Sequence, residues 1–96
     1  MIYLKIEHNV GKFYKDGTYI IIDKMVNEDL WRLANDVMND DDFQMDAYNE
    51  TLLPNKAHQI IYKHVYELLS SLQKRKEQYK NEIELMYKTA YDAYKQ

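Results

Sequence analysis

The last 42 residues constrain the fold most, because residues 55–96 contain no Gly and no Pro and keep their apolar residues in one helical phase. Four apolar residues are followed eighteen positions later by four more: Ile61, Val65, Leu68 and Leu72, then Tyr79, Ile83, Met86 and Ala90. Eighteen residues make five helical turns, so all eight lie along one stripe. A helix of this length is about 60 Å long, whereas a compact chain of this size is about 30–35 Å across. We therefore expect a helix that protrudes, bends or is covered by another chain.

The segment Gln73–Gln78 is the one place where this helix is ambiguous, because Arg75 and Lys76 occupy the stripe there. The segment is either the exposed middle of one helix or the turn of a helical hairpin, although it lacks the Gly, Asn or Pro usual in turns. Two independent helices would agree in phase only about one time in nine. The pattern favours one continuous helix over residues 55–95.

Residues 1–22 have a β pattern. Apolar and polar residues alternate in the opening segment MIYLKIE, as in a half-buried strand. Asp16-Gly17 is a strong signal for a two-residue hairpin turn. The resulting register pairs Tyr14 with Tyr19 and Phe13 with Ile20. An earlier turn near Gly11 would give a three-stranded antiparallel meander, and the alternative is one hairpin with a frayed partner.

Residues 27–50 predict two short helices. Asn27 is placed to cap the first helix, with Val26 stapled onto Trp31 and with Trp31 near the centre of the core. The apolar residues that follow have helical spacing: Leu30, Leu33, Ala34, Val37 and Met38. This helix should end near Asn39. Asp41 and Gln44 have the spacing of a capping box for a second short helix through about Glu50, and Pro54 opens the long helix.

These segments predict an α+β fold in a single domain spanning residues 1–96. Its parts are a β-hairpin or meander at 1–22, short acidic helices at 27–50 and a long helix at 55–95. A hydrophobic content of 46% and a charged content of 30% are typical of a globular chain. Two Gly and one Pro leave room for few loops.

Composition predicts a cytoplasmic, non-enzymatic protein without cofactors. The chain contains no Cys, its start is too polar for a signal peptide, and no segment approaches the ~20 apolar residues of a membrane span. The only serines, Ser70 and Ser71, lie deep in helical sequence, without the sharp turn of a serine nucleophile. Two isolated glycines cannot form a phosphate-binding loop.

The sequence shows no metal site. His58 and His64 are six residues apart on opposite sides of a helix, and with His8 they form no ligand pattern. We expect these histidines at the surface or in an interface. The acidic segment 39–50 lacks the central Gly of a calcium loop, and Phe43 and Met45 interrupt its oxygen ligands.

Acidic residues are concentrated in residues 23–50, where nine acids stand against two bases. Solvated helix faces and helix N-termini explain such a bias simply. The sharper interpretation is an acidic surface that meets a basic groove on a protein partner, such as a nucleic-acid-binding enzyme. The residues of that surface would be Asp36, Asp40, Asp41, Asp42 and Asp46.

The distal part of the long helix carries a second candidate surface. Aromatic residues and Met are enriched in interface cores, and this part lies beyond the reach of a small body. The predicted association face consists of Tyr79, Ile83, Met86, Tyr87, Tyr91 and Tyr94. A basic cluster beside it could contact phosphates: Lys74, Arg75, Lys76 and Lys80. A net charge of −3 makes nucleic acid an unlikely partner and favours a solvated face.

We therefore expect a protein-binding module, either an inhibitor or an adaptor. A homodimeric scaffolding protein and a dimeric nucleic-acid-binding regulator that uses residues 74–80 are the alternatives. A small, acidic, Cys-free chain with ten Tyr resembles the accessory proteins of phages and mobile elements, which include inhibitors of host nucleases and anti-CRISPR proteins. That resemblance is one of size and composition.

Overall fold

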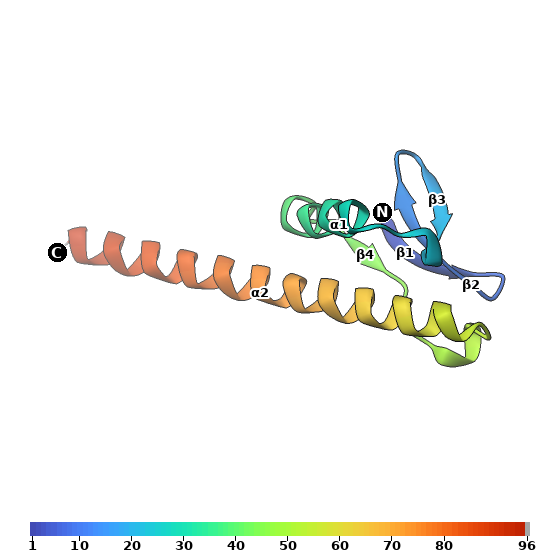
Figure 1. The fold of residues 1–96 in the computed structure, drawn as a ribbon. Helices are drawn as coiled ribbons and strands as arrows, with labels where there is room; N and C mark the ends of the chain where they lie inside the picture. Colours follow the sequence, from blue (N-terminus) through green and yellow to red (C-terminus); the bar gives the residue numbers. More distant parts are fainter. Residues whose placement is uncertain (96) are drawn as a thin grey trace.

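The protein has an α+β fold, as expected, in which a four-stranded sheet and a short helix pack against one end of a long helix (Figure 1). The computed structural model describes the backbone of residues 1–95 and the side chains of residues 1–93. Strands β1 (Ile2–Glu7), β2 (Val10–Lys15) and β3 (Thr18–Ile21) precede helix α1 (Asn27–Asn39), strand β4 (Gln44–Met45) and helix α2 (Lys56–Lys95). Short 3₁₀ turns span Ile22–Lys24 and Glu50–Leu52.

Strands β1, β2 and β3 form the antiparallel meander that the sequence predicts. The turn at Asp16-Gly17 has positive φ angles of 50° and 85°, and it sets the expected pairing of Tyr14 with Tyr19. The first turn lies at His8 and Asn9, whose φ angles are 52° and 63°. Both turns have the backbone of a two-residue hairpin loop, which matches the twist of the strands.

Gly11 lies inside β2 and does not form the first turn, contrary to the sequence interpretation. A Cβ atom at this position would lie 3.0 Å from Cδ2 of Tyr62 and 3.2 Å from Cγ2 of Ile22. The missing side chain therefore lets the fully buried ring of Tyr62 approach the sheet. Gly11 controls how closely α2 packs on the strands.

We predict that Gly11→Val lowers the free energy of unfolding by about 1–3 kcal/mol, because the added methyl groups overpack the contact with Tyr62. Valine is the better strand former, so local propensity predicts the opposite sign. Urea denaturation checks the prediction. Unchanged or increased stability would show that α2 can move away from the sheet at no cost.

The segment after α1 differs from the sequence prediction, since residues 41–50 do not form a second helix. Strand β4 instead pairs in parallel with β1, and the Asp46 N–H donates to the Leu4 carbonyl at 2.8 Å. Phe43 is buried and stacks on Tyr3, with ring centroids 4.4 Å apart. Burial of this ring and pairing with the open edge of β1 favour an extended backbone over a helix whose capping box is purely local.

Helix α1 begins at Asn27 itself, so Val26 is the N-cap and the helix starts one residue earlier than a cap at Asn27 requires. Asp29 accepts a hydrogen bond from the Val26 N–H at 3.1 Å, which satisfies one of the free N–H groups at the helix start. Trp31 was expected near the centre of the core, but 77% of it is exposed. Val26 is also exposed, so the two residues form no buried staple.

Asp29 joins α1 to the hairpin. Its carboxylate is buried and lies 2.8 Å from the Lys15 amine of β2. The interaction with Lys15 and the hydrogen bond from Val26 together hold the pKa of Asp29 below its usual value, against the opposing effect of burial. The charged form of Asp29 therefore stabilises the folded state.

We predict that Asp29→Asn lowers the free energy of unfolding by about 1–3 kcal/mol near neutral pH. Because the folded-state pKa is depressed, the carboxylate stabilises the fold fully above the unfolded pKa of about 3.9. That contribution is lost as the pH falls through the lower folded pKa. Denaturation from pH 7 to pH 2 should show the stabilities of wild type and variant converging under acid. A constant difference across this range would contradict the assigned role of the charge.

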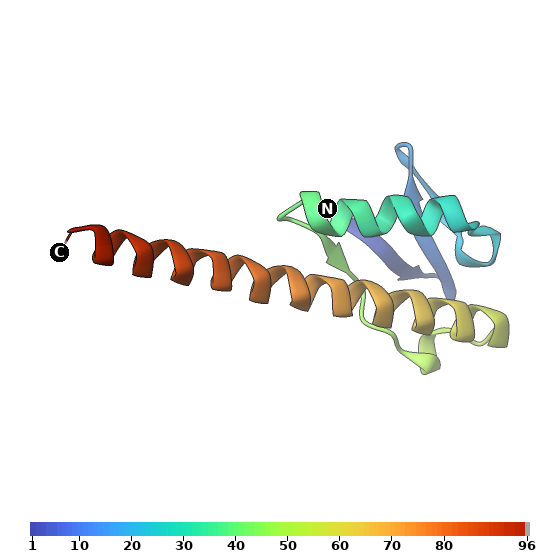
Figure 2. The ribbon, with the colours of Figure 1, turned by 60° about the vertical axis from the view of Figure 1, so that its left-hand side comes forward.

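The core lies where the sheet, α1 and the first half of α2 meet. Figures 1 and 2 show α1 running beside the first half of α2 and in the same direction. The buried apolar side chains come from every layer of this arrangement: Tyr3, Leu4, Phe13, Ile22, Leu33, Val37, Phe43, Leu53, Tyr62, Val65 and Leu69.

Helix α2 is continuous through Gln73–Gln78, as the periodicity favours, and it extends the molecule to 62 × 27 × 20 Å. The Gln73 side chain donates to the Phe43 carbonyl, and the Lys76 amine donates to the Val37 carbonyl, both at 3.0 Å. Every side chain from Glu77 to Ala93 is exposed. We call residues 1–76 the body and residues 77–95 the stalk.

Candidate protein-binding surface

The stalk carries a row of exposed apolar and aromatic side chains on one side of the helix. The described members, which we call the distal face, are Tyr79, Ile83, Met86, Tyr87 and Tyr91. Their spacing follows i, i+4, i+7 and i+8, which places them on one side of α2. Tyr87 and Tyr91 stack with centroids 6.4 Å apart. The side chain of Tyr94, the last residue predicted for this face, lies outside the described residues.

The distal face continues the stripe by which α2 packs in the body. Val65 and Leu69 are buried there, and Leu33 and Val37 of α1 belong to the same core cluster. Helix α1 has 13 residues and α2 has 40, which correspond to about 20 Å and 60 Å of helix. The stripe is therefore left uncovered where α1 ends.

A shallow apolar hollow between α1 and α2 adjoins the stalk. Its volume is about 480 Å³, and it is lined by Leu30, Trp31, Ala34, Asn35, Met38, Leu68 and Leu72. A second hollow, which shares Met38 and Leu72 with the first, reaches Tyr79. An apolar surface thus runs from Trp31 to the distal face. This part of the surface was not predicted from the sequence, because a lone Trp at helical spacing is typical of a core residue.

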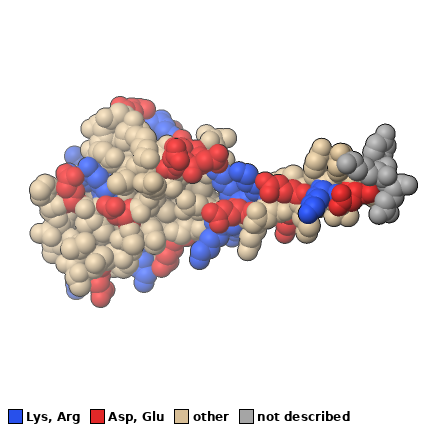
Figure 3. Space-filling model, turned by 180° about the vertical axis from the view of Figure 1, so that it is seen from behind, with Lys and Arg blue, Asp and Glu red and all other residues tan. Residues whose placement is uncertain are grey.

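Charged side chains alternate in sign along the stalk. Figure 3 shows acidic and basic groups along the middle of the stalk in this view, with uncharged atoms above and below them. Glu82 and Glu84 are followed by Lys88 and Asp92. Mixed charge of this kind keeps a helix hydrated and creates no electric field of a single sign. The feature that distinguishes the distal face from the rest of the stalk is therefore its apolar side chains.

The five acidic residues singled out in the sequence have different roles in the structure. Asp40 accepts a hydrogen bond from the Tyr3 hydroxyl at 2.5 Å and one from the Asp42 N–H at 2.9 Å. The bond from Tyr3 lowers the pKa of Asp40, and the same bond raises the pKa of Tyr3. Asp46 accepts a hydrogen bond from the Ile6 N–H at 3.0 Å and so helps to hold β4 beside β1.

The other three carboxylates gather with Asp40 near the end of α1. Asp36 is half-buried, and its pKa is raised by burial and by Asp40. Asp41 lies 3.2 Å from the Lys76 amine, and Asp42 is exposed. An acidic patch therefore exists at this end of the body, although two of the five predicted residues make internal hydrogen bonds.

The basic cluster is divided in a similar way. The Lys76 side chain is only 20% exposed, and its amine binds the last turn of α1 and Asp41, where a cation offsets the helix dipole. Lys74, Arg75 and Lys80 are exposed. The nearby hollow contains both signs of charge, with Asp40, Asp41 and Glu77 beside Lys76 and Lys80. This arrangement does not form a continuous basic track.

We predict that Lys76→Met lowers the free energy of unfolding by about 1–2 kcal/mol, because the carbonyl of Val37 and the carboxylate of Asp41 lose their common donor. Lys74→Met is the matched control, since Lys74 is exposed and lies two residues earlier on the same helix. Thermal or urea denaturation should separate the two variants. Equal stabilities would show that the Lys76 anchor contributes nothing.

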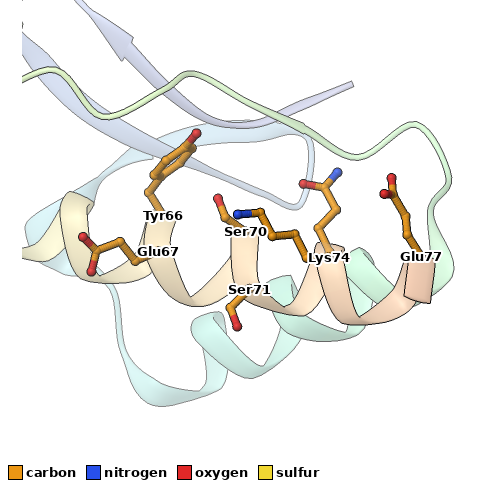
Figure 4. A pocket seen from close by; sticks show the side chains of 7 residues that line it. Tyr66, Glu67, Ser70, Ser71, Lys74 and Glu77 are labelled. Atoms are coloured by element: carbon orange, nitrogen blue, oxygen red, sulfur yellow. The ribbon is translucent and has the colours of Figure 1, made fainter. Parts of the chain in front are cut away.

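A further hollow lies along the polar side of α2 (Figure 4). It measures about 580 Å³, and its lining residues are Tyr66, Glu67, Ser70, Ser71, Gln73, Lys74 and Glu77. All of them come from one helix, and each is half-buried or exposed. In Figure 4, Ser70 and Ser71 point to different sides of the helix. The hollow therefore offers polar contacts without a buried group to orient a ligand.

The histidines depart from the prediction at one position. His8 and His64 are exposed as expected, whereas His58 is buried, with its Nε2 atom 3.7 Å from an Asp23 oxygen. No group of three or more His, Asp or Glu side chains within the described part of the chain is arranged to hold a metal ion.

Comparison with known proteins gives no relative: the chain matches no protein-family model, no curated protein and no solved structure. Among the described residues, no helix combines the length and the apolar character needed to span a bilayer.

Proposed function

We propose that this protein is a non-enzymatic protein-binding module that docks through the distal face of α2. The observation that carries the proposal is the row of large apolar side chains held in solvent on a protruding helix. Met86 and Tyr87 are 71% and 72% exposed, next to Tyr79 and Ile83 on the same side. Contiguous exposed apolar surface of this kind marks interaction sites in soluble proteins.

The binding mode that fits this geometry is a helix laid into a groove or against another helix. Anchors at i, i+4 and i+7 are typical of such recognition. Aromatic side chains contribute most of the binding energy at many interfaces, so the Tyr residues of the distal face are the expected anchors. Trp31, on the adjoining hollow, extends the surface onto the body.

The module that we propose is an inhibitor or an adaptor. The acidic patch supports a more specific proposal about the surface charge of its partner. Asp41 and Asp42 are exposed beside the root of the stalk. A partner with a basic surface, such as a nucleic-acid-binding enzyme of a phage host, would gain association rate from these charges more than affinity. The distal face supplies the affinity in this proposal, and the patch supplies orientation.

The geometry supports direct binding of nucleic acid less well. Lys76 is bound within the body, and acidic side chains lie between the exposed basic residues of α2. Affinity for phosphates grows with the number of cations that can reach them.

We predict that Met86→Glu weakens capture of the protein partner at least about tenfold, since it places a charge at the centre of the distal face. The matched control is Leu85→Glu, because Leu85 is also exposed, at 65%, but points about 160° around the helix from Ile83 and Tyr87 of the distal face. The measurement is a quantitative pull-down from the native host, read by mass spectrometry. Circular dichroism checks that both variants remain helical.

Two outcomes would count against the proposal. The first is equal capture by wild type, Met86→Glu and Leu85→Glu, which would remove the distal face from the binding site. The second is a larger loss in Leu85→Glu than in Met86→Glu, which would place the site on the other side of the stalk.

A further inference from the structure

We propose that a second copy of this chain covers the distal face, with the two stalks packed antiparallel as a symmetric pair. In this arrangement Tyr79 lies opposite the partner's Ala90, and Ile83 lies opposite the partner's Met86. The inference rests on the proposed binding role of the distal face and narrows the partner to the chain itself.

The site is the continuation of a helix–helix contact that already exists in the body. Helix α1 lies along the stripe of α2 as far as Lys76, whose amine binds the last turn of α1 at Val37. A helix that continues the line of α1 would cover the stripe beyond that point. The stalk of a second copy provides such a helix, because it is a straight α-helix with an apolar side of its own.

The body excludes a parallel pair of straight helices. In a parallel pair, the two α2 helices would face each other at the same height along their axes. Both α1 helices would then have to occupy the same space between them. An antiparallel pair places each body beyond the end of the other stalk, so α1 and the partner's stalk follow one another along α2. A closed two-fold contact of this kind uses the same surface twice.

The sizes of the side chains along the stripe set the register. Pairing each Tyr79 with the partner's Ala90 gives a shared overlap from about residue 77 to about residue 92, which begins just beyond the end of α1 at Lys76. This overlap is about 25 Å at 1.5 Å per residue. It pairs a large side chain with a small one at each end, since Tyr79 meets the partner's Ala90, and it places Ile83 against the partner's Met86 in the middle.

Charge favours the same orientation. Lys80 and Tyr87 lie on the same flank of the stripe, so the antiparallel register brings each Lys80 amine near the partner's Tyr87 ring. A cation beside an aromatic face is attractive. In a parallel pair, residues five positions apart face each other across the flank, which would bring Arg75 against the partner's Lys80 and repel. The chain therefore contains an electrostatic bias against the parallel alternative.

The area of the contact predicts its strength. A fully covered aromatic side chain buries about 150–250 Å². With the exposed fractions of the distal face, two copies would bury on the order of 1,000 Å², at the lower limit for a specific interface. The body has its own core, so the monomer can fold without its partner. We therefore expect a reversible dimer with a dissociation constant in the micromolar range.

Disulfide trapping tests orientation and register directly, because the chain has no Cys of its own. Full-length Tyr79→Cys and Ala90→Cys variants are oxidised separately and as an equal mixture. The antiparallel register brings these positions together, whereas the two Tyr79 positions lie about 16 Å apart along the helix, beyond the ~4.4–6.8 Å Cα separation of a disulfide. We expect a mixed disulfide dimer and little self-linked product from either variant alone. Self-linked Tyr79→Cys as the main product would establish a parallel pair and overturn the inference.

Sedimentation equilibrium of the unmodified chain supplies the second readout. We expect the mass of the wild-type chain to rise from monomer to dimer with increasing concentration. Met86→Glu should abolish this rise, and Leu85→Glu should retain it. A monomer mass at several hundred micromolar overturns the inference. If such a monomer still captures a host protein through Met86, only the second copy as partner is removed and the proposed function stands. The opposite result is also possible: the chain forms the dimer, but Leu85→Glu and Met86→Glu capture host proteins equally. That result would contradict binding of a host protein through the distal face and would leave the dimer standing.

Discussion

The length difference between α1 and α2 is the constraint on which the rest of this structure depends. Thirteen residues of α1 and a small sheet reach along the apolar stripe of α2 only as far as Lys76, whereas the helix itself has forty residues. The core is complete where these elements meet, with Leu33, Val37, Val65 and Leu69 in one cluster. The same stripe then continues into solvent. The exposed apolar surface therefore follows from the regularity of a helix that is longer than its cover.

The point where α2 leaves the body is held by polar contacts. Gln73 and Lys76 bind backbone carbonyls of Phe43 and Val37, and Lys76 also pairs with Asp41. These contacts satisfy carbonyl groups at the end of α1 and in the segment just before β4, and they fix the direction in which the stalk projects. Acidic residues have a similar structural role elsewhere, because Asp29, Asp40 and Asp46 each accept internal hydrogen bonds. Three of the nine acids of residues 23–50 are therefore used within the fold, and Asp41 and Asp42 remain exposed near the stalk.

A protruding amphipathic helix with mixed charge and a modest apolar face suits reversible association. The interface that it can form with its own kind is near the lower limit of specific contacts, and the body folds around a separate core. Such a face can exchange partners, since a second copy and a heterologous protein would compete for the same side chains. Trp31 and the hollow between α1 and α2 add a further apolar contact that a larger partner could use. In the proposed scheme, self-association would therefore control docking.

The sequence by itself determined the features that depend on local periodicity. The single phase of residues 55–96 predicted one continuous helix, and Asp16-Gly17 predicted the hairpin and its register. The sequence also indicated the distal face, because a helix of this length must extend beyond a small body. Tertiary structure decided what depends on contacts between distant segments. Phe43 stacking on Tyr3 and the open edge of β1 turned a helical capping pattern into β4, and close packing of Tyr62 explains Gly11 inside a strand. Trp31 is exposed and His58 is buried because the neighbouring elements decide which side of a helix is buried. The spacing of residues within one helix does not specify those neighbours.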